Sequence, residues 1–226
     1  MSENRDMRHI AVLGGTGAEG GGLAFRWASA GLRVIIGSRD EGKAKAAAAA
    51  LNEKLGKSSV EGAGNAAAAA KADVVLLSVP YAVQMDTALA VREHLAGKVL
   101  IDVTAPLKPP KVGTVQLPAG GSCVVALQQA LGTEVKVVSA FQNVSAHHLQ
   151  DPGWTMDCDV LVCGDSKEAR EQVIELVAAA GMKGIHAGPL ANSAAAEALT
   201  SVLIHINRNY KVSGAGIRIT GLEEHK

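Results

Sequence analysis

The sequence predicts an α/β fold in which helices cover both faces of a mainly parallel sheet. Short apolar runs rich in β-branched residues alternate with longer helical stretches, which is the order expected when helices connect parallel strands. Hydrophobic residues make up 48% of the 226 residues, so the chain can bury a large core. Aromatic residues make up only 3%, whereas glycine occurs 25 times. This composition suits closely packed helices and strands better than an all-β sandwich.

The apolar runs are predicted to be strands. They are short and nearly continuous in apolar character, as expected of strands whose two faces are both buried. In chain order the predicted strands are His9–Leu13, Arg33–Gly37, Val74–Val79, Val99–Val103, Val135–Ala140, Val160–Gly164 and Gly184–Ala187.

The longer segments between these runs are predicted to be helices. Two of them are rich in alanine, the strongest helix former. The last one lies beyond the final strand and forms a small C-terminal helical extension. In chain order the predicted helices are Glu19–Ala30, Glu41–Leu55, Gly64–Lys71, Val83–Leu95, Val124–Leu131, Lys167–Ala180 and Leu190–Tyr210.

The stretch Ala105–Ser122 is predicted to be a loop, because it is rich in proline and glycine and shows little periodicity. It directly follows a predicted strand, a position at which lids and substrate-binding segments occur. A simple connector fits the same observations equally well.

The charge balance and the apolar pattern exclude several classes of protein. Lysine and arginine together number 22, equal to aspartate and glutamate, so the chain lacks the basic field of a nucleic-acid-binding protein. The first ten residues lack the apolar run of a secretory signal, and no run of about 18 uncharged apolar residues predicts a membrane span. We therefore expect a cytoplasmic protein that binds neither nucleic acid nor membrane.

The three cysteines are predicted to be reduced thiols. Cys158 and Cys163 lie in one apolar run, and on an extended strand two residues five apart point to opposite faces, so they cannot bridge each other. A metal site would need a second cluster of ligands, which the sequence does not offer. Reduced thiols in a cytosolic protein are the preferred interpretation, and we expect no metal.

A glycine-rich turn, Gly15-Thr16-Gly17-Ala18-Glu19-Gly20, directly follows the first strand and begins the first helix. We expect Gly15 to permit the tight turn, Gly17 to let the backbone approach a pyrophosphate, and Gly20 to let helix and strand pack closely. The N-terminus of the helix would offer free N–H groups and the positive end of its dipole to that pyrophosphate. The turn therefore predicts a Rossmann-type dinucleotide-binding fold, with all six residues as candidate cofactor ligands.

The end of the second strand favours NADP(H) over NAD. Gly37 occupies the place where an NAD-binding unit usually has an acid that binds the ribose 2′-hydroxyl. Ser38 and Arg39 follow, and Lys43 comes one helical turn later. The planar guanidinium of Arg39 can bind a 2′-phosphate, to which Lys43 adds charge and which Thr16 can also reach. The alternative is that this segment is only a solvated helix start.

Three segments follow strands at the edge where open α/β sheets bind ligands, namely Ser78–Tyr81, Thr104–Leu107 and Ala140–Val144. We expect no lysine, histidine or carboxylate to dominate this edge, and we expect His147 and His148 to begin a helix rather than to form a catalytic pair. Without a proton donor, direct hydride exchange between two bound coenzymes is favoured, because it relies mainly on proximity and orientation.

Several motifs resemble one known family over almost the whole chain, that of the coenzyme F420-dependent NADP oxidoreductases. The last two of these motifs, in this order, are the most specific, whereas the glycine turn is shared with many Rossmann enzymes. The motifs are Ala11–Gly17, Gly37-Ser38-Arg39 with Lys43, Ser78-Val79-Pro80-Tyr81, Val138-Ser139-Ala140, Val162-Cys163-Gly164-Asp165 and Ala187–Ser193.

The resemblance implies that NADP(H) binds on the glycine turn. Thr16, Ser38, Arg39 and Lys43 would surround its 2′-phosphate, and Ser78-Val79-Pro80 belongs to the same set of expected cofactor-binding residues. No side chain is expected to act as a chemical catalyst, because the two coenzyme rings would react by direct apposition.

The resemblance also implies that coenzyme F420, a deazaflavin, lies against the nicotinamide. The backbone around Ala140 and the side chain of Val144 would hold the two rings together, and Thr200 matches a polar position near the deazaflavin. We expect residues 1–188 to form the NADP-binding domain and residues 189–226 to complete the acceptor site. The family also implies a homodimer.

The chain departs from the family's archaeal form at several positions. It has Gln142, Ala194 and Ala198 where that form has histidine, arginine and serine, and Ser145 replaces a proline. These differences leave open an NADPH-dependent reductase of another acceptor, such as a flavin, quinone, imine or metal chelate. A third interpretation is a protein that senses the redox state of NADP(H) without turnover.

Overall fold

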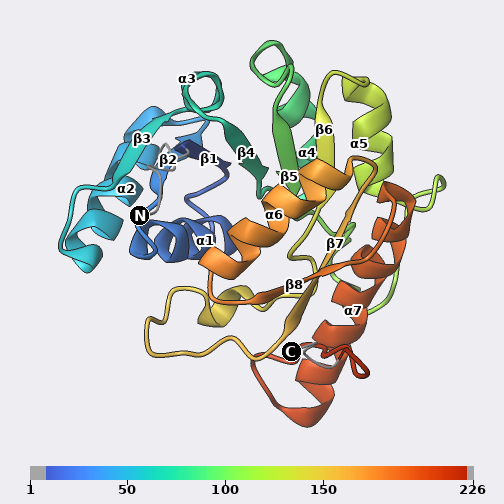
Figure 1. The fold of residues 1–226 in the computed structure, drawn as a ribbon. Coiled ribbons are helices and arrows are strands. Elements are labelled where there is room, and N and C mark those ends of the chain that lie inside the picture. The colour runs from blue at the N-terminus through green and yellow to red at the C-terminus, as the bar shows by residue number, and fades with distance from the viewer. Residues whose placement is uncertain (1–8, 223–226) are drawn as a thin grey trace.

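The computed structural model describes residues 9–222, which build one eight-stranded sheet with helices on both faces (Figure 1). The strand order across the sheet is β3-β2-β1-β4-β5-β6-β7-β8. The strands are β1 (His9–Leu13), β2 (Arg33–Ser38), β3 (Val60–Gly64), β4 (Val74–Leu77), β5 (Val99–Asp102), β6 (Lys136–Ser139), β7 (Asp159–Gly164) and β8 (Lys183–His186).

The order in which strands are added to the sheet reverses at β1. Val12 pairs with Ile36 of β2 on one side and with Leu76 of β4 on the other, both in parallel register. The chain first adds β2 and β3 on one side and then crosses back to add β4 and the later strands. This order creates a crevice beyond the carboxyl ends of β1 and β4, the usual ligand site in open α/β sheets. Among the strand pairs of residues 9–222, only β6–β7 is antiparallel.

The helices divide between the two faces of the sheet. Apolar side chains of α1, α2 and α6 pack on one face, and those of α3, α4 and α5 pack on the other. The helices are α1 (Ala18–Ser29), α2 (Glu41–Leu55), α3 (Asn65–Lys71), α4 (Tyr81–Leu89), α5 (Cys123–Leu131), α6 (Lys167–Ala179) and α7 (Ser193–Tyr210), with short 3₁₀ turns η1 (Arg92–His94), η2 (Ala146–His148) and η3 (Leu190–Asn192).

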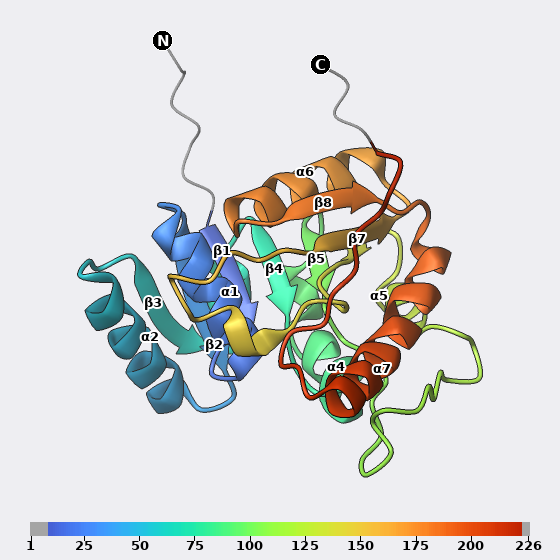
Figure 2. The same ribbon diagram turned by 90° about the horizontal axis from the view of Figure 1, so that it is seen from below.

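Helix α7 lies outside these two layers, against α5 and β7 at one end of the sheet (Figure 2). Its amphipathic character explains this position, since Ala196 and Leu203 are buried whereas Val202 is exposed. No helix among residues 9–222 is long and apolar enough to cross a membrane.

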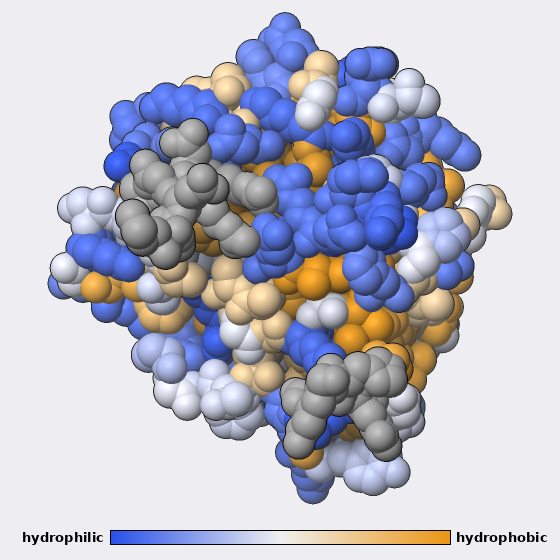
Figure 3. Space-filling view, in the orientation of Figure 1, coloured by the Kyte–Doolittle hydropathy of each residue, from blue (hydrophilic) through white to orange (hydrophobic). Residues whose placement is uncertain are grey.

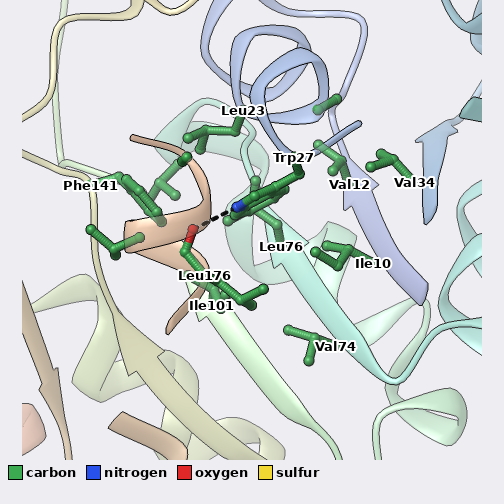
Figure 4. Packing of buried hydrophobic residues seen from close by; sticks show 14 of the residues in the cluster. Ile10, Val12, Leu23, Trp27, Val34, Val74, Leu76, Ile101, Phe141 and Leu176 are labelled. Carbon is green, nitrogen blue, oxygen red and sulfur yellow. Dashed lines mark hydrogen bonds between the residues drawn. The ribbon is translucent and has the colours of Figure 1, made fainter. Parts of the chain in front are cut away.

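Trp27 of α1 is the largest fully buried side chain and joins three elements (Figure 4). Its indole Nε1 donates a hydrogen bond of 2.8 Å to the backbone oxygen of Leu176 in α6. Its ring meets the ring of Phe141 edge-on, with 6.2 Å between centroids. Since Phe141 lies just beyond β6, Trp27 couples the first helix to the loop at the carboxyl edge of the sheet.

Most predicted elements are confirmed to within a few residues. The clear omission is β3 (Val60–Gly64), which pairs in parallel with β2. Its sequence, VEGAG, has only one large apolar residue, because it is an edge strand with one neighbour and needs little apolar surface. Gly62 also allows close packing, since a Cβ atom there would lie 2.4 Å from the backbone oxygen of Ala44 in α2.

Two predicted helices were wrong in their extent. The segment Val83–Leu95 is not one helix, since α4 ends at Leu89 and the chain continues into the 3₁₀ turn η1. The segment Leu190–Tyr210 is likewise divided, into η3 and α7. The predicted strands also ended too late at Val79, Val103 and Ala140, because the chain leaves the sheet there to form the ligand edge.

We expect Trp27→Phe to destabilise the protein by about 1–3 kcal/mol, because it removes the indole hydrogen bond to the Leu176 carbonyl and leaves a cavity beside Phe141. Urea unfolding followed by circular dichroism measures this loss. Trp154→Phe is the matched control, since Trp154 is 46% exposed and its replacement should cost less than about 1 kcal/mol. Equal losses for the two variants would contradict the role given to Trp27.

Candidate functional site

The turn after β1 depends on Gly14, one residue before the six-residue motif. Gly14 has a φ of 86°, and a Cβ atom there would lie 2.0 Å from the backbone oxygen of Ser78. No other residue fits this position, because the backbones after β1 and β4 are in contact. Gly14 rather than Gly15 is the residue of this turn with a positive φ. Gly15 instead packs against Ile36 and the Val12 carbonyl.

The remaining glycines of the motif bring the N-terminus of α1 close to the turn. Gly17 is the N-cap residue of α1, and its backbone N–H donates to the Gly14 oxygen at 3.0 Å. A Cβ atom at Gly20 would lie 2.8 Å from the same oxygen, which confirms that Gly20 permits close packing of helix and strand. Thr16, Gly17 and Ala18 are exposed. The first turn of α1 can therefore offer backbone N–H groups to an anion.

A cavity of about 200 Å³ lies beside this turn at the carboxyl ends of β1, β2 and β4. It brings together most of the predicted 2′-phosphate and edge residues from three separate segments. Lys43 is not part of its lining and lies in the first turn of α2, next to the N-cap residue Asp40. The lining residues are Gly14, Thr16, Gly17, Ser38, Arg39, Asn65, Ser78, Val79, Pro80, Val83 and Thr87.

The cavity is suited to a phosphate group. Among residues 9–222, neither Arg39 nor Lys43 forms an ion pair, whereas Glu41 of the same helix start pairs with Lys45 at 2.6 Å. The side-chain oxygen of Asn65 is buried without a hydrogen-bond partner. The donor and charge set therefore fits a phosphate-bearing nucleotide, with Arg39 as the planar cation.

Packing also explains the missing acid at the end of β2. A Cβ atom at Gly37 would lie 2.7 Å from Leu13 Cδ2 and 2.9 Å from the side-chain oxygen of Asn65. A longer side chain at this position would displace both neighbours. The position that holds an acid in NAD-binding proteins is thus closed to any side chain here.

The segment after β6 forms the second part of the site at the carboxyl ends of the strands. Phe141 is buried and has a φ of 73°, a strained conformation for a residue with a side chain. The turn directs Gln142 inward, where its Nε2 donates to the backbone oxygen of Asp102 at 2.8 Å. Thr200 of α7 donates to the backbone oxygen of Gln142 at 2.8 Å. The structure thus joins Thr200 to the segment that contains Ala140 and Val144.

Ala140 and Val144 differ in accessibility. Ala140 is fully buried, and its N–H donates to the Asp102 oxygen at 3.3 Å, so only its backbone borders the edge. Val144 is partly buried and packs against the core. Among the described residues, three buried oxygens close to this segment lack hydrogen-bond partners, namely Thr104 Oγ1, Ser139 Oγ and Gln142 Oε1. Buried polar atoms without hydrogen-bond partners are rare in protein cores, and they commonly mark a functional site.

Two carboxyl groups lie at this edge, so the expectation that no carboxylate dominates it was wrong. Asp102, the last residue of β5, is fully buried and accepts hydrogen bonds from Gln84 and from the N–H of Thr104. Burial raises the pKa of Asp102 to about 6, although these hydrogen bonds oppose the shift. Burial, together with the nearby charge of Asp102, raises the pKa of Glu19 to about 8.

A third buried carboxyl, Glu197 of α7, was also missed. It accepts hydrogen bonds from the N–H groups of Cys123 at 2.8 Å and Val124 at 3.3 Å, and from the hydroxyls of Ser122 and Ser193. A negative group at the N-terminus of α5 is favoured by the helix dipole. Glu197 therefore fixes α7 to the end of the 105–122 loop.

The remaining predicted residues lie away from the cavity. His147 and His148 do not begin a helix, because they are the last two residues of the isolated 3₁₀ turn η2, where His148 stacks on Trp154 with 3.8 Å between ring centroids. The three cysteines are free thiols. Among the described residues, no group of three or more histidine, cysteine or acidic side chains is arranged to hold a metal.

A larger hollow, of about 720 Å³, lies at the opposite edge of the sheet. It is lined by segments that precede β5 and β6, including Arg92 and Glu134. It contains none of the predicted site residues, and it lies at the amino ends of the strands, where α/β sheets seldom bind substrates. Size alone therefore does not identify the functional site.

The parallel sheet, its crevice at β1 and β4, and the glycine turn at the start of α1 define a Rossmann-type dinucleotide-binding protein. Residues 9–106 match the family model of coenzyme F420-dependent NADP oxidoreductases. The chain belongs to this family, as its relatives show over nearly the whole sequence.

Two curated relatives are archaeal. The F420-dependent NADP reductase of Methanothermobacter thermautotrophicus is 42% identical over 224 residues, covering 96% of this chain and 97% of the relative. That of Methanocaldococcus jannaschii is 42% identical over 225 residues, covering 95% and 99%. A solved structure from Arthrobacter sp. FB24, proposed to be an F420-dependent NADP reductase, is 28% identical with a TM-score of 0.77 and covers 93% of this chain and 98% of that chain.

We expect Glu19→Gln to change how stability depends on pH. Because the fold raises the pKa of Glu19, the folded state favours the neutral carboxyl. Its contribution to stability is complete below about pH 4.5 and is lost as the pH rises through about 8. The variant should therefore gain stability over the wild type between pH 5 and 8.5, by roughly 1–2 kcal/mol since solvent reaches part of the side chain.

Urea unfolding at pH 5, 6.5 and 8.5 measures this difference. Glu41→Gln serves as the control, since Glu41 is exposed and its pairing with Lys45 lowers its pKa. The free energy of unfolding of Glu41→Gln should not rise relative to the wild type as the pH increases. A constant difference between Glu19→Gln and the wild type would contradict the raised pKa.

Proposed function

We propose that the protein transfers hydride between NADP(H) and coenzyme F420. The observation that carries this proposal is the end-to-end likeness to archaeal F420-dependent NADP reductases, which spans both the glycine turn and α7. The two halves of the carboxyl edge support it, because one half fits a nucleotide phosphate and the other contains unpaired buried acceptors.

The glycine turn and the start of α1 would bind the pyrophosphate of NADP(H). Gly15, Gly17, Ala18 and Gly20 contribute backbone there, and Gly14 keeps the turn tight. The 2′-phosphate would lie in the cavity between the two loops, where Thr16, Ser38 and Arg39 converge and Lys43 adds charge from α2.

Ser78-Val79-Pro80 would form the wall beneath the nucleotide, since these residues line the same cavity.

The segment around Ala140 and Val144, held by Thr200, would position the acceptor against the nicotinamide. With both coenzymes bound, this segment would supply the proximity and orientation that hydride transfer between their rings requires. The buried edge would exclude water from this transfer. Glu19 can hold a proton on its carboxyl at neutral pH, because its pKa is raised to about 8.

We propose further that the protein is a cytoplasmic homodimer. Apolar side chains are exposed on α7 and the following tail, namely Val202, Tyr210, Val212, Ile219 and Leu222. Figure 3 shows apolar atoms gathered at the lower right, over α7 and β8. Exposed patches of this kind commonly mark interfaces, and free thiols suit a reducing compartment.

In this proposal residues 1–188 bind NADP(H), and residues 189–226 complete the acceptor side. Two contacts of α7 support these separate roles. Thr200 contacts the Gln142 backbone, and Glu197 contacts the N-terminus of α5.

The first experiment is anaerobic oxidation of NADPH by the purified protein with F420, followed at the absorbance band of the deazaflavin. We expect rapid reduction of F420 with NADPH and much slower reduction with NADH. Tight NADPH binding without reduction of F420 would overturn the acceptor and favour a flavin, quinone, imine or metal chelate. NADPH binding without turnover of any acceptor would favour a redox sensor.

We expect Arg39→Ala and Lys43→Ala to weaken NADPH binding far more than NADH binding. Loss of one charge-assisted hydrogen bond costs roughly 1.5–3 kcal/mol, which corresponds to about a ten- to hundredfold loss of affinity. Fluorescence titration with each coenzyme measures the effect. Lys45→Ala is the matched control, because Lys45 pairs with Glu41 on the same helix. Equal losses for NADPH and NADH would contradict the assignment of the 2′-phosphate site.

A further inference from the structure

Two long segments of the chain contain no acidic residue, although acids and bases balance at 22 each over the whole sequence. The first is residues 103–133, which includes the loop after β5. The second is residues 198–222, which includes most of α7 and the tail that follows it. All the charged side chains in these two segments are cations, namely Lys108, Lys111, Arg208, Lys211 and Arg218.

The fold brings these two segments together. A Cβ atom at Gly113 of the loop would lie 3.5 Å from Arg208 Nη1 and 3.8 Å from the Cα of His205, so the loop packs on the C-terminal half of α7. Figure 2 shows the loop running beside α7. The Nε2 of Gln116 donates to the backbone oxygens of Lys108 and Lys111 and so holds the two lysines on one turn.

Four of these cations lack an ionic partner. Lys108, Lys111, Arg208 and Lys211 are exposed, and none of them forms an ion pair within residues 9–222. Arg218 differs, because it pairs with Asp157. We call the four unpaired residues the cationic strip. Like charges on adjacent segments repel one another, so the electrostatic energy of the strip is lowest when an anion is bound to it.

The cationic strip begins next to the proposed acceptor site. The loop leaves β5 directly after Asp102, and Glu197 ties its far end to α7. Thr200, which contacts the Gln142 backbone, lies eight residues before Arg208 on the same helix, so about 12 Å along the helix axis separates them. An acceptor ring held at Gln142 can therefore extend a chain of that length onto the strip.

We infer that the cationic strip binds the anionic chain of the acceptor coenzyme. This inference rests on the proposed function, since F420 carries a phosphodiester and a glutamyl tail on its deazaflavin ring. The guanidinium of Arg208 suits a phosphodiester, and the spaced ammonium groups of the lysines suit successive carboxylates. The strip would therefore bind a deazaflavin that carries this anionic tail more tightly than one without it.

The test is equilibrium binding of two probes to the NADP⁺-loaded protein, measured by quenching of deazaflavin fluorescence. One probe is F420, and the other is the same deazaflavin without phosphodiester and glutamyl tail. For the triple variant Lys108→Ala, Lys111→Ala and Arg208→Ala, we expect F420 affinity to fall about five- to thirtyfold and its salt dependence to decrease. Affinity for the tail-less probe should stay unchanged.

A matched triple variant controls for net charge, with Arg33→Ala, Lys57→Ala and Lys183→Ala, three exposed cations elsewhere. It should bind both probes as the wild type does. Equal losses for both probes, or no loss for F420, would overturn the inference while the proposed function stands. A wild type that binds NADPH but neither deazaflavin would overturn the proposed function and the inference together. Thermal melting confirms that each variant is folded.

Discussion

The contact between the backbones that follow β1 and β4 sets the geometry of the whole carboxyl edge. At Gly14 the two chains are so close that a Cβ atom would lie 2.0 Å from the Ser78 oxygen. This contact forces a tight turn, and the turn places the N-cap Gly17 and the first turn of α1 above the crevice. Gly20 and Gly37 extend the same constraint, because side chains there would strike the Gly14 oxygen and Leu13. These three glycines therefore let the backbones around the cavity pack closely.

Helix α1 transmits this geometry to the other half of the edge. Trp27 holds Phe141 in its strained conformation from one side. The preceding residue, Arg26, donates to several carbonyls of the segment after η2, including those of Leu149 at 2.9 Å and Trp154 at 3.0 Å. From the opposite side, Thr200 of α7 binds the Gln142 backbone. The segment that would position the acceptor is thus supported by rigid helices rather than by its own structure, which suits a reaction that depends on orientation.

The sequence could predict the parts of this molecule that follow local rules. Strands buried on two faces are continuous apolar runs, and the glycine turn and the cationic start of α2 lie next to one another in the chain. It could not predict what depends on distant packing. Gly14 resembles its neighbouring glycines until Ser78 is placed against it. Asp102 was assigned to an apolar strand, and its role emerges only when Gln84 and Gln142 converge on it. Glu197 looks like an ordinary helix residue until α5 presents its N-terminus to it.

The distribution of charge follows from what two anionic coenzymes require at one site. Cations at Arg39, Lys43 and the cationic strip lie outside, where solvent lowers the cost of leaving them unpaired. The acids at the inner edge would repel the same ligands if they were all ionised. Burial counters this, because it raises the pKa of Glu19 to about 8 and so keeps this carboxyl mostly neutral near pH 7. Asp102, whose pKa is raised to about 6, keeps its charge under hydrogen bonds from Gln84 and Thr104. Asp102 thus keeps a negative charge whose oxygens already accept hydrogen bonds from the protein.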